Sequence, residues 1–115
     1  MYHKDLEAWK KSIDLVTKVY SLVNNFPEDE KFGLISQIKR AAVSVPSNIA
    51  EGAARFSNKE MLRFLDISLG SLAELETQFI IAERLNFFQN IDLYEDIKEV
   101  AAIISGLKKY LLKKA

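Results

Sequence analysis

Long segments with an apolar residue at every third or fourth position are the feature that most constrains this chain. Between residues 6 and 23 apolar side chains recur at these steps, which places them along one side of an α-helix. Only four glycines and two prolines interrupt the 115 residues. The sequence therefore predicts an all-α fold. The stripe of the first helix is assigned to Leu6, Trp9, Ile13, Val16, Tyr20 and Val23.

Three further segments keep this helical period. In the second, residues 34–52, the period continues without a phase break at Pro46, so we expect a single helix that runs past the proline. Proline removes a backbone hydrogen bond inside a helix at a cost of about 3 kcal/mol, which packing must offset. The apolar stripes of the last two helices comprise Met61, Leu65, Leu69, Leu72, Leu75 and Phe79, then Leu93, Ile97, Val100, Ile104, Leu107 and Leu111.

Capping signals mark where the last two helices begin. Ser57 and Glu60 have the spacing of a capping box, and Asp92 and Glu95 repeat that spacing before the final apolar stripe. Four helices joined by short turns are typical of an antiparallel up-and-down four-helix bundle. At this length we expect one domain over residues 1–115.

Composition argues against several classes of protein. The chain has no cysteine, and no apolar run approaches the roughly 20 residues of a membrane span. Its N-terminus lacks the apolar region of a signal peptide, so we expect a cytoplasmic protein that does not bind membranes. His3 is the only histidine, so no Glu-x-x-His pair of a di-iron bundle and no nucleophile-and-base arrangement is available. We expect no enzyme, with no catalytic, cofactor-binding or metal-ligating residues and no cofactor.

A polar stripe crosses the middle of the chain, where small residues flank hydrogen-bonding ones. It comprises Arg40, Ser44, Asn48 and Glu51 on the second helix, with Ser71 and Glu74 facing them from the third. Antiparallel pairing places Arg40 level with Glu74, so we expect an ion pair there, because a buried polar group without a partner costs about 1 to 3 kcal/mol. The stripe is interpreted as a structural device that fixes helix register, with a ligand site or an oligomer contact as alternatives.

The same region carries a family resemblance. The segments "RAAVSVPSNIAEG" and "RFLDISLGSLAELETQ" resemble the two signature segments of the four-helix-bundle family named for 23S rRNA intervening-sequence proteins. The resemblance extends from "KDLEAWKKSIDLV" to the last helix. It implies a bacterial protein that forms a cyclic homo-oligomer, expected to be a pentameric ring. A related group serves reverse transcriptases as accessory proteins, which implies RNA or a nucleic-acid enzyme as a partner.

Apolar residues outside the main stripes support the expectation of an oligomer. They lie on the first, third and fourth helices and comprise Leu15, Val19, Ile67, Ile81, Ile103 and Tyr110. A monomer would leave part of this second stripe exposed to water. Five phenylalanines are interpreted as packing residues, although exposed aromatic rings also stack on bases: Phe56, Phe64, Phe79, Phe87 and Phe88.

Zero net charge conceals an uneven distribution. In an up-and-down bundle the N-terminus, the turn between helices two and three, and the C-terminus share one end, and basic residues dominate there, whereas acidic residues dominate the other end. The candidate nucleic-acid contacts are Arg55, Lys59, Arg63, Lys108, Lys109, Lys113 and Lys114. Two functional classes stay open: an accessory protein that binds RNA or a ribonucleoprotein, and an oligomeric scaffold that binds another protein without nucleic acid.

Overall fold

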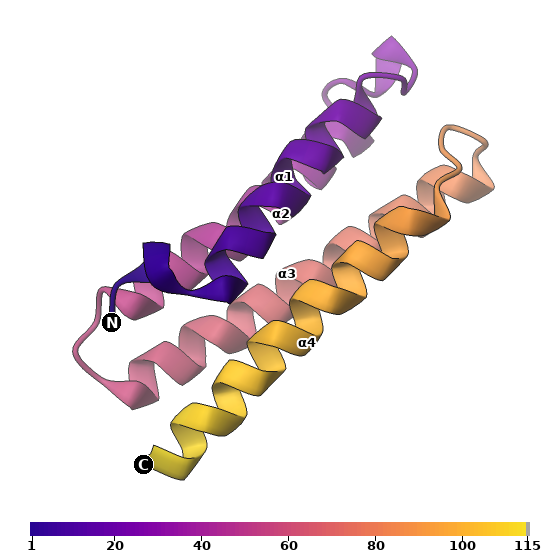
Figure 1. The fold of residues 1–115 in the computed structure, drawn as a ribbon. Coiled ribbons are helices and arrows are strands. Elements are labelled where there is room, and N and C mark those ends of the chain that lie inside the picture. Colours follow the sequence, from indigo (N-terminus) through magenta and orange to yellow (C-terminus); the bar gives the residue numbers. More distant parts are fainter. Residues whose placement is uncertain (115) are drawn as a thin grey trace.

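The computed structural model describes residues 1–114, apart from the side chain of Ile91, and contains four α-helices. They are α1 (Glu7–Val23), α2 (Leu34–Ala53), α3 (Asn58–Arg84) and α4 (Ile91–Lys114), and short 3-10 turns at His3–Asp5 and Glu28–Glu30 precede α1 and α2. No strand occurs in this part of the chain. In Figure 1 the N-terminus, the α2–α3 connection and the end of α4 lie together, and the other two connections lie at the far end.

Each helix has two neighbours, so the four helices surround one core. Helix α2 lies between α1 and α3, and α4 closes the arrangement by contacting both α3 and α1. The core combines fully buried side chains from all four helices, among them Val19, Ile38, Ile49, Leu65, Leu75, Phe79, Leu93 and Ile104. Most positions assigned to the stripes of the last two helices are buried, as predicted.

The buried face of α1 differs from the predicted one. Leu15 and Val19, which we assigned to a surplus outer stripe, are buried in the core together with Ala8 and Ser12. Trp9 and the other residues of the predicted stripe are half-buried or exposed, except for Val23. Alanine and serine carry too little apolar surface to be recognised as core positions, but their small size suits a helix face close to its neighbours. Of the remaining outer residues, Ile67, Ile81 and Tyr110 are exposed and Ile103 is half-buried.

Helix α2 continues past Pro46, as predicted, and Pro46 is buried. Nearby, the buried hydroxyl of Ser68 on α3 donates a 2.9 Å hydrogen bond to the carbonyl oxygen of Val45. Helices α2 and α3 form the most closely packed pair. The approach is tightest at Gly52, where an added Cβ would lie 2.8 Å from Met61 Sδ and 2.8 Å from Phe64 Cβ.

One predicted helix start is confirmed and the other is wrong. The Ser57 hydroxyl accepts a 3.3 Å hydrogen bond from the Glu60 backbone N–H and caps α3. At α4, Asn90 Oδ1 accepts a 3.2 Å bond from the Leu93 N–H, so asparagine caps the helix and Asp92 lies in its first turn. Asparagine is as strong an N-cap as aspartate, and a carboxylate in the first turn complements the helix dipole.

We expect Gly52→Ala to lower the free energy of unfolding by about 1 to 3 kcal/mol, because the added methyl group overlaps Met61 and Phe64. Gly106→Ala is the matched control, since a methyl group added there meets nothing within 4 Å and alanine favours the helix by up to about 1 kcal/mol. Urea unfolding of both variants measures the difference. Equal stabilisation by the two substitutions would contradict the close approach of α2 and α3.

Candidate nucleic-acid interface

The seven candidate contacts lie at one end of the bundle, which we call the basic end. Arg55, Lys59 and Arg63 flank the α2–α3 connection, and Lys108, Lys109, Lys113 and Lys114 lie on the last turns of α4. Figure 1 shows these two segments at the same end of the molecule. All seven side chains are exposed except that of Lys108, which is half-buried.

Three of these seven cations already have acidic partners. Arg55 pairs with Glu51 at 2.9 Å, and Lys108 pairs with Asp66 on α3. Arg63 Nε lies 3.2 Å from Glu60 Oε2, and this hydrogen bond is the main reason that the pKa of Glu60 lies below its usual value. Within residues 1–114 the other four, Lys59, Lys109, Lys113 and Lys114, form no ion pair. The unpaired charge of this end therefore resides mainly on lysines.

Some phenylalanine rings pack in the core and others are exposed to solvent. Phe64, Phe79 and Phe88 are buried, in agreement with the packing interpretation. Phe56 is fully exposed at the basic end, so that interpretation is wrong for this residue. Its position in a turn, outside the apolar period of either neighbouring helix, is the sequence signal that sets it apart. The guanidinium groups of Arg55 and Arg63 lie 5.3 and 4.5 Å from the centroid of the buried Phe64 ring.

Only part of the polar stripe forms hydrogen bonds between α2 and α3. Ser44 Oγ and Ser71 Oγ are 2.8 Å apart, and Asn48 Nδ2 donates to the Ser44 carbonyl at 2.8 Å and to its hydroxyl at 2.9 Å. The expected Arg40–Glu74 ion pair does not form among the described residues. Both side chains are exposed, where water screens their attraction and pairing contributes little. Glu51 is also exposed, bonded to Arg55.

Sequence reasoning missed an open groove along α1 and α2. Its apolar half is lined by Trp9, Ile13, Val16, Thr17, Val43, Pro46, Ser47 and Ala50. Its basic half shares Val43 and is lined by Tyr20, Lys31, Phe32, Ile35, Ser36, Lys39, Arg40 and Ser44. Four of the six residues that we assigned to the core stripe of α1 line this groove: Trp9, Ile13, Val16 and Tyr20. The sequence signal for this groove was that α1 carries two stripes with three-and-four spacing. Only one of them can face the core, so the other had to face outward.

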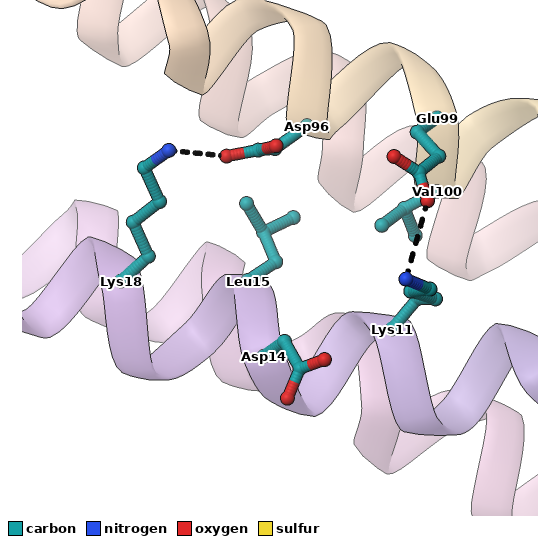
Figure 2. A pocket seen from close by; sticks show the side chains of 7 residues that line it. All are labelled: Lys11, Asp14, Leu15, Lys18, Asp96, Glu99 and Val100. Atoms are coloured by element: carbon teal, nitrogen blue, oxygen red, sulfur yellow. Dashed lines mark hydrogen bonds and ion pairs between the residues drawn. The ribbon is translucent and has the colours of Figure 1, made fainter.

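A smaller cleft lies between α1 and α4 (Figure 2). Leu15 and Val100 line it, and ion pairs of Lys18 with Asp96 and of Lys11 with Glu99 cross it. The two lysines are seven residues apart, so both lie on the same side of α1. We interpret the two ion pairs as contacts that align α1 with α4. Because both lysines of the cleft are paired with carboxylates of the same chain, we do not assign it a ligand.

Two absences concern residues 1–114 only. No group of three or more histidine, aspartate or glutamate side chains there could hold a metal ion. None of the helices there is long and apolar enough to cross a membrane. His3 packs its ring against Trp9, with the centroids 5.3 Å apart.

Comparison with known proteins is consistent with this geometry. Residues 4–106 match the family described as 23S rRNA-intervening sequence protein. A crystal structure of a protein with unknown function from the S23 ribosomal protein family of Bacteroides thetaiotaomicron is similar, with a TM-score of 0.63. The similarity covers 92% of this chain and 95% of that one at 21% identity, which supports a shared fold alone. No curated protein is detectably similar in sequence.

We expect Asn48→Leu to lower the free energy of unfolding by about 1 kcal/mol, because the variant loses both hydrogen bonds to Ser44. Ser47→Ala is the control at the neighbouring exposed position, with an expected effect within about 0.5 kcal/mol. Chemical denaturation measures both values. If Asn48→Leu left stability unchanged but altered the binding of a ligand, the polar stripe would have to be interpreted as a binding site and not as a structural device.

Proposed function

The chain belongs to the 23S rRNA-intervening sequence protein family, and we propose that it is a non-enzymatic RNA-binding protein whose basic end contacts backbone phosphates. The observation that supports this most strongly is that four lysines without acidic partners in the described chain and an exposed phenylalanine lie at the same end of the bundle. Lysines without acidic partners attract phosphates and release counterions when they bind them. The family and its solved relative carry no description of a catalytic activity.

Binding of this kind does not depend on base sequence. Lys113 and Lys114 lie in the last turn of α4, so their charges sit at a helix end and not along a face that would enter a groove of duplex nucleic acid. Contacts to phosphates position a protein on nucleic acid but carry no sequence information. We therefore expect modest affinity that falls steeply with salt.

We further propose that antiparallel up-and-down bundles assemble into a closed cyclic homo-oligomer, a pentamer, through the groove along α1 and α2. The exposed side of α3 that carries Ile67 and Ile81 offers a complementary apolar surface. Glu74 lies between them at steps of seven residues, so it shares this side and complements the basic half of the groove. Groove and α3 face are different surfaces, and such heterologous contacts close into rings. Copies pointing the same way would bring their basic ends to one face of the ring.

The second candidate function is that of a scaffold that binds another protein. The observation that favours it is the same groove, whose apolar half would accept a partner helix as readily as a second copy. The two functions predict different salt dependence. Binding through the groove should persist at high salt, whereas binding through lysines should not.

Replacing Lys108, Lys109, Lys113 and Lys114 by glutamine should weaken RNA binding without unfolding the bundle, because these side chains lie outside the core. The dependence of log affinity on log salt should become shallower by about 0.7 for each single-strand phosphate that the variant no longer neutralises. Fluorescence anisotropy titrations at several salt concentrations, starting at about 50 mM, measure both effects.

A matched control compares equal changes of charge at the two ends. Lys113→Gln with Lys114→Gln removes two charges from the basic end, whereas Arg84→Gln with Lys98→Gln removes two from elsewhere on α3 and α4. Only the first pair should weaken binding. If wild-type protein retains no RNA at about 50 mM salt, where counterion release favours binding, the scaffold function replaces the RNA-binding one.

Charge reversal tests the proposed assembly. The Ser44–Ser71 hydrogen bond connects α2 with α3, and four residues before Ser44 and three after Ser71 the side chains of Arg40 and Glu74 are level, so they would meet between adjacent copies. Arg40→Glu or Glu74→Arg alone should reduce the oligomer mass measured by light scattering, and the double variant should restore it. A wild-type protein that is monomeric at micromolar concentration would contradict the assembly.

A further inference from the structure

The α2–α3 connection forms a shallow hollow at the basic end. Arg55, Phe56, Ser57 and Asn58 line one part of it. Gly52, Ala53 and Met61, together with Met1 at the N-terminus, complete the lining. The hollow thus combines an aromatic ring, a guanidinium group, polar side chains and an apolar floor. This combination occurs where proteins hold an unstacked nucleobase, since the base needs a flat partner for its face and polar groups for its edge.

The Phe56 ring does not pack against the rest of the chain. Its side chain is fully exposed, whereas Phe64, eight residues later, is buried. The connection is shaped by other groups, namely the end of α2 at Ala53 and the Ser57 hydroxyl that caps α3. A polar residue at position 56 would avoid the free-energy cost of exposing a large apolar ring to water. The ring is therefore available for a partner from outside the chain.

The charges around Phe56 favour a partner that is anionic. Arg55 is held in place by Glu51 at 2.9 Å and by the face of the Phe64 ring at 5.3 Å. Arg63 is held by Glu60 and by the same ring. Lys59 has no acidic partner within the described chain, and the side chain of Asn58 makes no hydrogen bond there. Arg55 thus lines the hollow next to the exposed ring, and the free Lys59 lies three residues after Phe56, in the first turn of α3.

We propose that Phe56 stacks on an unpaired base of single-stranded RNA, while Arg55 and Lys59 contact the phosphates on either side of that base. Asn58 is placed to bond the polar edge of the base. The inference rests on the proposed RNA-binding function and narrows it to single strands. In a duplex the faces of the bases are covered by their neighbours, so Phe56 would find no exposed face.

The test uses the full chain and three labelled probes of equal length: an oligouridine, the same backbone with abasic positions, and an RNA duplex. Wild-type protein should bind the oligouridine more tightly than either of the others, because stacking adds to the phosphate contacts. Phe56→Ala should weaken binding of the oligouridine by about fivefold or more. Its affinity for the abasic probe should stay unchanged, and Phe56→Tyr should keep the wild-type preference.

The matched control is Leu85→Ala, which removes another large exposed apolar side chain, 52% accessible, where α3 ends at the opposite end of the bundle. It should leave all three affinities unchanged. Equal binding of the oligouridine and the abasic probe by wild-type protein would overturn the stacking site and leave the phosphate-binding function intact. Absence of wild-type binding to all three probes would instead overturn the proposed function and this site with it.

Light scattering of Phe56→Ala separates stacking from a contact between copies. An unchanged oligomer mass together with weaker oligouridine binding supports the proposal. A reduced mass would show that Phe56 packs against a neighbouring copy, and the base-stacking role would then be wrong. Far-UV circular dichroism of the same samples confirms that the comparison is between folded proteins.

Discussion

The close approach of α2 to α3 is the constraint on which the rest of the structure depends. Ala41, Ala42, Gly52 and Ala53 are all buried on α2, and Gly52 leaves no room for even a methyl group. Such an approach brings backbone within reach of side chains on the facing helix, as in the Ser68 bond to a carbonyl of α2. Packing of this density offsets the hydrogen bond that the buried proline cannot make. The same approach fixes the turn that presents the basic end.

Local sequence signals predicted the helices well, because each depends on residues close together in the chain. The serine cap of α3 is an example, since the hydroxyl of Ser57 bonds an N–H only three residues away. The start of α4 was misassigned because Asn90 and Asp92 are both good caps, and only the backbone decides between them. The buried face of α1 was misassigned because two stripes fit the same period, and the choice between them is made by the neighbouring helices.

Pairing of exposed charges was beyond the reach of sequence analysis for a different reason. Arg40 and Glu74 are level across α2 and α3, yet each remains in solvent. Arg55 instead pairs with Glu51, one helical turn away, where the pair gives up little side-chain freedom. Surface ion pairs differ by only about 1 kcal/mol or less, so side-chain entropy and local spacing decide which ones form. The difference in charge between the two ends of the bundle does not depend on which ion pairs form, because it follows from the order of the helices.

The groove along α1 and α2 and the basic end lie on different sides of the molecule. The groove runs along the side of α1 and α2, whereas Phe56 and the lysines of α4 lie at the end of the long axis, which spans 46 Å. Contacts made through the side would therefore leave the ends uncovered. Each added copy would place another basic end beside the first, and because counterion release grows with the number of phosphates neutralised, affinity would rise with copy number. A chain of zero net charge can in this way present a strongly positive surface, provided that its copies share one direction.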